Sequence, residues 1–450
     1  MRILLSLLLL TFISSTALAK EKILDIQKIK SANGIEAWLV EDHSLPIISI
    51  KFAFKGAGTV NLSENQQGLS QLLSNTMDEG AGEYTSQEFQ KLLSDNSITL
   101  RFNSNRDNFG GTLKFLTREK QKAAELLTIA LNDPRFDEEP VERIKQANIS
   151  RIKSSQTNPS WIAARIYNDR AYEGHPYALN SGGTLSTLPS ITADDLRDFK
   201  NTQLTQDRLV VGASGDISAE QLGILLDNIF GKLPKTAPET NVEKTKIKNK
   251  GSTFFYKKDI PQTVLTLAVD SIDETNPDFY TLRVLNHIFG ASGFGSRLME
   301  EAREKKGLTY GIYSGLTNNE YVDALTISTS TKNDTVAQML GIIKDEMDKI
   351  KNNITNEEIQ KAKDFIIGSM PLSLTNNDSI SSIALSLQLS NRSINYLDEY
   401  ADKISAVTKK DAMRVAQDLL TPDNMLTIMV GNPTDINENI IEITEIPNVE

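Results

Sequence analysis

The 450-residue sequence contains no cysteine. Disulfide bonds, thiolate nucleophiles, cysteine-based zinc sites and a lipidated cysteine anchor are therefore excluded. Histidine is also scarce, because only His43, His175 and His287 occur, and no two of them have the short spacing of a pair of metal ligands. We interpret each of the three as a surface histidine, or as a partly buried one whose ring nitrogens are satisfied by hydrogen bonds.

Positive charge is in deficit. The 48 Lys and Arg residues stand against 59 Asp and Glu residues, which gives a formal net charge of -11. Non-specific nucleic-acid binding requires clustered Lys and Arg, so we expect no nucleic-acid partner. The hydrophobic share of 39% and the charged share of 24% are typical of a soluble globular protein.

Long apolar runs are confined to the N-terminus. Arg2 supplies a positive charge, residues 3–13 are almost wholly apolar, and residues 17–19 (Ala-Leu-Ala) match a signal-peptidase cleavage site. We therefore predict a signal peptide at residues 1–19 and a mature chain that is exported to the periplasm. The run is too short to span a membrane and no later run approaches the required length, so no membrane association is expected after signal removal. The alternative is a retained N-terminal anchor.

The sequence repeats itself. Four landmarks recur in the same order at an offset of about 217 residues. Chance explains the alignment of any one landmark, but four in register indicate two similar halves. The landmarks are a strand after a proline (residues 47–54 and 263–269), a helix after a polar, acidic start (from Asp137 and Asn356), a helix with a threonine N-cap (Thr192 and Thr408), and a strand that ends in glycine (209–212 and 426–431).

The two halves predict two homologous lobes of α+β class. Residues 232–252 are rich in lysine and poor in apolar residues, as linkers are, and we set the linker at 236–252. The lobes then span residues 20–235 and 253–450. Strands and helices come in separate groups, which favours an antiparallel-rich sheet with packed helices over a doubly wound sheet. The clearest pair of antiparallel strands is residues 99–102 and 108–116.

The first half contains a helix with a polar face. Residues 63–66 form a capping-box pattern, and the predicted helix that follows spans residues 68–77. Gln71, Ser74 and Asn75 lie together on one face of it, at positions i, i+3 and i+4. The opposite face carries an apolar stripe at helical spacing: Leu69, Leu72, Leu73 and Met77.

This helix, which starts with Gly-Leu behind the predicted strand at residues 47–54, resembles the zinc-binding helix of the pitrilysin/insulinase family of peptidases. That family carries the inverted motif H-x-x-E-H, in which the two His bind zinc and the Glu activates water. A distal Glu is the third ligand. By the resemblance, Gln71 and Asn75 hold the two His positions and Ser74 holds that of the general base. Arg151 holds the position of the distal ligand.

The residue types at these four positions argue against zinc on chemical grounds as well. Amides and a hydroxyl are poor zinc ligands in comparison with imidazole and thiolate. The guanidinium of Arg151 carries a positive charge that repels a cation. We therefore predict that this chain holds no metal and no other cofactor.

The second half contains a glycine-rich turn, then a short helix and a strand. The helix is predicted to begin near Ser296, with Lys305 and Lys306 in its last turn, where the helix dipole favours positive charge. Gly307 is predicted to end it as a C-cap. A tight turn with positive φ is the structural interpretation of the three glycines of the turn, and substrate contact is the functional one: Gly290, Gly293 and Gly295.

The same stretch resembles the family's glycine-rich loop with its S-R-L and R-E-x-x-G-L-x-Y segments. By the resemblance, Arg303 and Tyr310 reach the substrate backbone near the zinc of a facing lobe and stabilise charge on the scissile carbonyl. Arg offers several fixed hydrogen-bond donors and Tyr one more, which suits an oxyanion. Arg297 and the glycines are expected to line the substrate chamber. The structural alternative makes Arg303 a solvated helix residue and packs Tyr310 in a strand with Leu308 and Ile312.

The resemblance implies a divided enzyme. In some bacterial and organellar members of the family, one subunit supplies the zinc motif, its partner supplies the Arg/Tyr pair, and the two close as a clamshell around peptides that add as an edge strand. We therefore predict the non-catalytic, substrate-binding subunit of a heterodimeric zinc metallopeptidase, with a peptide substrate and a homologous partner that binds the zinc. The alternatives are a stand-alone peptide-binding pseudoenzyme or scaffold, and an active peptidase with unusual ligands.

Overall fold

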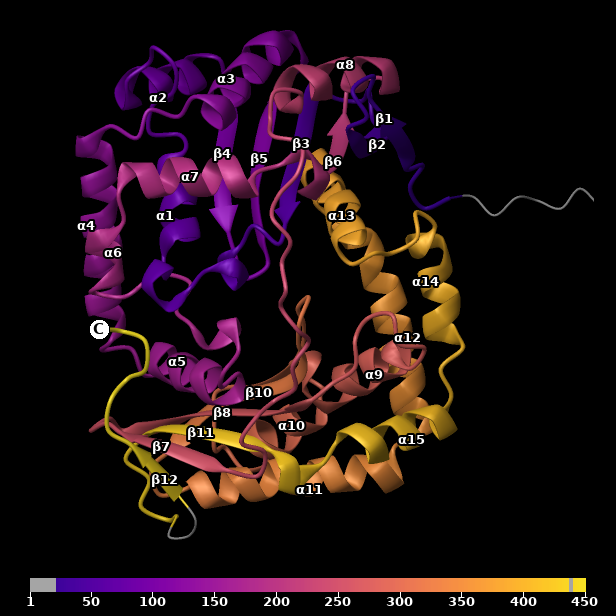
Figure 1. Cartoon of the computed structure of the whole chain (residues 1–450). Coiled ribbons are helices and arrows are strands. Elements are labelled where there is room, and N and C mark those ends of the chain that lie inside the picture. Colours follow the sequence, from indigo (N-terminus) through magenta and orange to yellow (C-terminus); the bar gives the residue numbers. More distant parts are fainter. Residues whose placement is uncertain (1–21, 437–439) are drawn as a thin grey trace, which may run out of the picture.

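Two lobes, each built around one β-sheet, make up the computed structural model (Figure 1). The structure describes residues 22–436 and 440–450, so the predicted signal peptide at 1–19 lies outside the described residues. No helix in these ranges has the length and the apolar character that crossing a membrane requires.

The first sheet is formed entirely by the first half of the chain. Its strands are β1 (Gln27–Lys30), β2 (Glu36–Glu41), β3 (Ile47–Lys55), β4 (Thr99–Ser104), β5 (Asn108–Leu116) and β6 (Leu209–Gly215). They stand in the order β1-β2-β6-β3-β5-β4, with β2 and β6 parallel and the other pairs antiparallel. The predicted pairing of residues 99–102 with 108–116 is confirmed.

The second sheet repeats this arrangement with the second half of the chain. Its strands are β7 (Thr253–Lys257), β8 (Gln262–Asp270), β9 (Ile312–Asn318), β10 (Asp323–Lys332), β11 (Leu426–Gly431) and β12 (Ile440–Ile443). The order β7-β11-β8-β10-β9 reproduces β2-β6-β3-β5-β4 of the first sheet, and β12 adds beside β7. The predicted α+β class, with two similar lobes, is confirmed.

Three helices begin at threonine caps, of which the sequence indicated Thr192 and Thr408. Thr192, Thr355 and Thr408 each accept a hydrogen bond from the backbone N–H three residues later, which satisfies a donor at the start of α7, α12 and α15. The helices of the first half are α1 (Leu69–Thr76), α2 (Ser86–Asp95), α3 (Lys120–Asn132), α4 (Glu138–Ser155), α5 (Pro159–Ala171), α6 (Thr187–Ser190), α7 (Ala193–Gln203) and α8 (Ala219–Phe230). Those of the second half are α9 (Phe279–Asn286), α10 (Arg297–Met299), α11 (Val336–Asn353), α12 (Asn356–Ser369), α13 (Asn377–Leu389), α14 (Tyr396–Ser405) and α15 (Lys409–Leu419).

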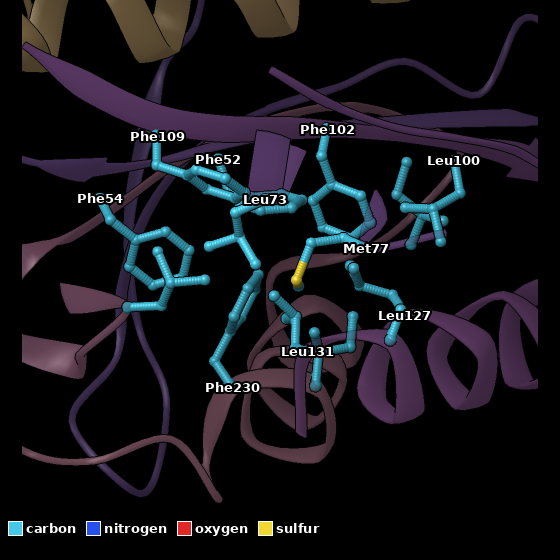
Figure 2. Packing of buried hydrophobic residues seen from close by; sticks show 14 of the residues in the cluster. Phe52, Phe54, Leu73, Met77, Leu100, Phe102, Phe109, Leu127, Leu131 and Phe230 are labelled. Carbon is cyan, nitrogen blue, oxygen red and sulfur yellow. The ribbon is translucent and has the colours of Figure 1, made fainter. Parts of the chain in front are cut away.

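Alternation along β3 sorts its side chains between two layers. Ile48, Ile50, Phe52 and Phe54 enter the main core of the first lobe, where the apolar stripe of α1 also lies. The ring of Phe52 meets those of Phe54, Phe102 and Phe230 edge-on, at centroid distances of 6.1, 6.2 and 5.4 Å. Figure 2 shows this aromatic centre against Leu73 and Met77 of the helix region.

The two halves exchange one helix each. Helix α13, from the second half, covers the face of the first sheet that bears Ser49, and its Ser381 hydroxyl lies 3.0 Å from that of Ser49. Helix α5, from the first half, covers the second sheet, where Ile162 and Ile166 join a core with Ile428 of β11. The helices occupy equivalent places in the repeat, and Figure 1 shows α13 under the upper sheet and α5 over the lower one.

Both ends of the described chain also cross between the halves. The N–H of Ile23 donates to Asp398 of α14 at 2.8 Å. At the other end, Val449 is buried in the core of the first lobe, and its carbonyl accepts from the N–H of Leu185 at 2.7 Å. The linker contains no helix or strand between α8 and β7, and its Ile247 is buried against the second sheet. The lobe limits at 20–235 and 253–450 stay a prediction.

Replacing Gly212 by Ala should destabilise the protein by about 1–3 kcal/mol, because overpacking a tight contact displaces backbone. A Cβ on Gly212 would meet the carbonyl oxygen of Ser381 at 2.4 Å and the nitrogen of Leu385 at 2.5 Å, both in α13. Urea unfolding measures the change. Gly341→Ala is the matched control, because a Cβ there meets no atom within 4 Å. An unchanged unfolding midpoint for Gly212→Ala would contradict the tight seating of α13.

Candidate functional site

Helix α1, which carries the predicted polar face, packs beside β4, an edge strand of the first sheet. The predicted capping box forms between Ser63 and Gln66, but it caps a short 3₁₀ turn rather than α1 itself. Helix α1 begins one turn later, after Gly68, whose φ of 91° is left-handed and favours glycine. Close approach explains this glycine too, since a Cβ would lie 2.8 Å from the Cα of Gly183.

Three of the predicted site residues meet on this face. The Nε2 of Gln71 lies 3.4 Å from the Ser74 hydroxyl and 3.4 Å from the Oδ1 of Asn75. Ser74 donates to the carbonyl of Gln71 at 2.8 Å, so its hydroxyl hydrogen is used within the helix. Such a hydroxyl has no general base beside it, and the face offers amides where a zinc site needs imidazole or carboxylate.

Helix α4 packs against α1 and carries the fourth predicted position. Arg151 is exposed and donates to the Oδ1 of Asn148 at 3.1 Å. Asn148 is only 4% exposed, and among the described residues its Nδ2 has no hydrogen-bond partner. Sequence analysis missed Asn148, because a lone amide three residues before Arg151 gives no signal without the fold.

The carboxyl groups near α1 follow its C-terminal end. Glu79 accepts from Arg143 at 2.6 Å and is therefore already paired. Burial raises the pKa of Asp78 to about 6. Among residues 22–436 and 440–450, no three His, Cys, Asp or Glu side chains lie close enough together to hold a metal ion.

The three histidines lie in separate places. The ring of His43 is exposed, and the hydrogen bond to Asp216 at 2.7 Å raises its pKa. The Nδ1 of His175 accepts from the N–H of Tyr177 at 3.1 Å. The ring of His287 lies 4.8 Å from that of Phe365, and burial lowers its pKa.

The glycine-rich turn of the second lobe is built as predicted at two of its three glycines. Gly293 and Gly295 have φ of 67° and 87°, which require glycine. The prediction of positive φ is wrong for Gly290, which lies in a helical turn after α9. A Cβ on Gly290 would meet the Ser314 hydroxyl at 2.5 Å, so close packing against β9 explains this glycine.

Arg297 has structural partners. Its guanidinium donates to Glu358 at 2.7 and 2.9 Å and to the Oδ1 of Asn353 at 2.7 Å. Burial alone would raise the pKa of Glu358, but the hydrogen bonds from Arg297 and Thr355 outweigh it and lower the pKa. A guanidinium held in this way is not free to bind a peptide.

Arg303 and an aromatic residue of the turn form a pair on the surface. The guanidinium of Arg303 lies 4.5 Å from the ring centre of Phe294, which is 67% exposed. Within the described residues, Arg303 forms no ion pair. Sequence analysis missed Phe294, although an aromatic side chain between two turn glycines was a readable signal.

Tyr310 stands on a rigid segment but is itself free. The residue is 84% exposed and lies before β9, so it does not pack in a strand between Leu308 and Ile312. The hydroxyl of Thr331 donates to the carbonyl of Leu308 at 2.8 Å, and that of Thr329 donates to the carbonyl of Gly311 at 3.0 Å. Two threonines of β10 therefore fix the backbone on both sides of the tyrosine.

The polar face of α1 and the pair of Arg303 and Tyr310 each lie near an edge strand of a sheet. The two edge strands end at one contact between the lobes. Strand β4 is an edge of the first sheet and β9 an edge of the second. Beyond their ends, the N–H of Glu320 donates to Asp107 at 3.2 Å, and the hydroxyl of Tyr177 donates to the same carboxylate. Tyr313 of the edge strand β9 is itself 52% exposed.

Comparison with known proteins identifies the family. Residues 50–184 match the model of the insulinase (peptidase M16) family, and residues 190–365 match that of the peptidase M16 inactive domain. The chain belongs to this family, as the resemblance implied. It lacks the zinc motif at the corresponding helix, as a non-catalytic M16-like protein does.

Relatives of the chain include a protein named as a non-peptidase homolog and one named as a peptidase subunit. The non-peptidase homolog YmxG of Helicobacter pylori is 29% identical over 347 residues, which are 76% of this chain and 78% of that protein. The mitochondrial-processing peptidase subunit beta of Neurospora crassa is 22% identical over 396 residues, 84% of this chain and 82% of that protein. A crystal structure of a peptidase M16 inactive domain from Pseudomonas fluorescens has a TM-score of 0.85 and 26% identity, and the match covers 92% of this chain and 100% of that chain.

Proposed function

We propose that this protein is the non-catalytic, peptide-binding subunit of a two-subunit zinc metallopeptidase. The observation that carries the proposal is the pairing of a degenerate α1 face with an intact Arg303, which is half-buried, and a Tyr310 that is 84% exposed. The side chain of Tyr310 is 84% exposed on a rigid segment and has no packing role. Keeping its apolar surface in water costs free energy. Contact with a ligand supplies the missing reason.

The geometry suits an extended peptide beside β9. Its unpaired outer edge offers backbone donors and acceptors, so a peptide adds there as a further strand. Tyr310 immediately precedes this edge, and the guanidinium of Arg303 lies on the adjoining turn of helix against Phe294. Both donate hydrogen bonds to a peptide carbonyl, and the bonds strengthen as that oxygen gains negative charge.

Zinc belongs to the partner in this proposal, where it would polarise the carbonyl and activate water. The residues of this chain bind the peptide, hold its carbonyl in place and exclude water. A subunit of this kind has no activity alone. The relative named as subunit beta of the mitochondrial-processing peptidase supports the idea of paired subunits in this family.

Native mass spectrometry of the protein from its own source tests the proposal. We expect a complex of about twice the mass of the chain, with a second family member that carries H-x-x-E-H. Peptidase activity should copurify with the complex and disappear when a chelator removes zinc. A monomer or homodimer that binds peptides, with no effect of the chelator, would favour the stand-alone pseudoenzyme instead.

A further inference from the structure

The polar face of α1 is neutral and rich in hydrogen-bond donors. It carries two primary amides, Gln71 and Asn75, around the buried hydroxyl of Ser74. The contacts of the Gln71 amide are long, at 3.4 Å, so a better acceptor can displace them. Gln71 and Asn75 are half-buried and remain within reach of a ligand.

The register of α4 brings further donors to the same face. The two helices pack antiparallel in Figure 1, and Arg143 of α4 pairs with Glu79 just after α1, at 2.6 Å. From this pair, the eight residues along α4 to Arg151 cover about 12 Å, at about 1.5 Å per residue. Because the two helices are antiparallel, this stretch of α4 runs back from Glu79 towards the start of α1, where Gln71 lies.

Asn148 lies on the same stretch of α4. It stands five residues beyond Arg143, about 7.5 Å along the helix from the ion pair. Its Oδ1 is occupied by Arg151, and its buried Nδ2 has no hydrogen-bond partner. An unpaired buried donor destabilises the protein, so a ligand that supplies an acceptor there recovers this free energy.

We propose that this face binds the carboxylate of a peptide. A carboxylate accepts several hydrogen bonds, favours a guanidinium, and matches a set made of Arg151 and the amides of Gln71, Asn75 and Asn148. The carboxyl groups of Asp78 and Glu79 lie at the far end of the face from Arg151. The face does not suit a cation or a metal ion, because it presents hydrogen-bond donors and a positive charge.

The neighbouring strand indicates why the carboxylate belongs to a peptide. Helix α1 packs on β4, an edge strand whose Arg101 side chain is exposed. A peptide that adds along this edge passes the polar face of α1. The site lies on the other lobe from Arg303 and Tyr310, so it does not rest on the proposed role of that pair.

Fluorescence anisotropy on the isolated, full chain tests the proposal. The probes are one labelled, flexible peptide with a free C-terminal carboxylate, the same peptide amidated, and an amidated form with one Glu. We expect the carboxylate forms to bind at least about tenfold more tightly than the neutral amide, as for a hydrogen bond to a charged group. The two carboxylate probes distinguish a C-terminal carboxylate from an acidic side chain.

Substitutions on the surface of the site show which residues cause the preference for a carboxylate. Arg151→Ala should abolish the preference for carboxylate, and Asn75→Asp should reverse it by adding a like charge. Lys153→Ala removes a positive charge from an exposed position two residues along α4, on another face, and should leave the preference intact. Equal binding of the acid and the amide by the unmodified chain would overturn the proposal, as would an unchanged preference in Arg151→Ala.

Discussion

Replacing Arg303 by Ala together with Tyr310 by Phe should lower kcat of the assembled peptidase about 100- to 1000-fold, the cost of losing an oxyanion donor. The substitutions remove the guanidinium and one hydroxyl from a surface where neither group pairs within the described chain. Folding and assembly should be unaffected, because Tyr310 is 84% exposed. Steady-state kinetics on the purified complex, with KM determined separately, measures the change.

The partition between kcat and KM decides the role of the pair. Donors that act on the developing oxyanion lower kcat, whereas donors that only hold the substrate raise KM. Arg118→Ala is the matched control, because it removes an exposed guanidinium whose one ion pair within the described residues is with its neighbour Glu119, at 3.0 Å. Full activity of the double variant in an intact complex would refute the role assigned to Arg303 and Tyr310.

Replacing Phe52 by Ala should lower the free energy of unfolding by about 3–5 kcal/mol, the usual cost of a cavity of this size. The ring is 1% exposed, and three other aromatic rings close around it (Figure 2). Those rings come from β3, β4 and α8, so the cavity would open where three elements meet. Urea unfolding followed by circular dichroism measures the loss.

Phe294→Ala is the matched control for this truncation. The same atoms are removed from a ring that is 67% exposed, and the lost contact with Arg303 is worth at most about 1 kcal/mol. A similar, small effect of both substitutions would mean that the aromatic centre of the first lobe is not close-packed.

Most of what could be predicted about the fold came from local patterns in the sequence. The threonine caps at Thr192 and Thr408 and the alternation along β3 depend on neighbouring residues, so they are visible in the sequence. The sheet on which a helix packs is not visible in the sequence. Nothing in residues 159–171 distinguishes a helix that packs on its own sheet from one that packs on the sheet of the other half, since both need an apolar stripe.

The same distinction applies to the candidate site. The family resemblance located Gln71, Ser74 and Asn75, and the structure brings them together because helical spacing is a local property. Arg297 was assigned to the substrate surface, although its partner Glu358 stands 61 residues later in the chain. A guanidinium looks the same in the sequence whether it is free or paired, so only the fold separates Arg297 from Arg303.

The exchange of α5 and α13 has a consequence for synthesis from the N-terminus to the C-terminus. When the ribosome has completed the first half, Ile162 and Ile166 have no sheet to cover, because β11 appears more than 250 residues later. The first sheet likewise waits for α13, which leaves Gly212 and Ser214 of β6 uncovered. Neither half can finish on its own, so the nascent chain exposes apolar surface until almost all of it has been made and then folds as one cooperative unit.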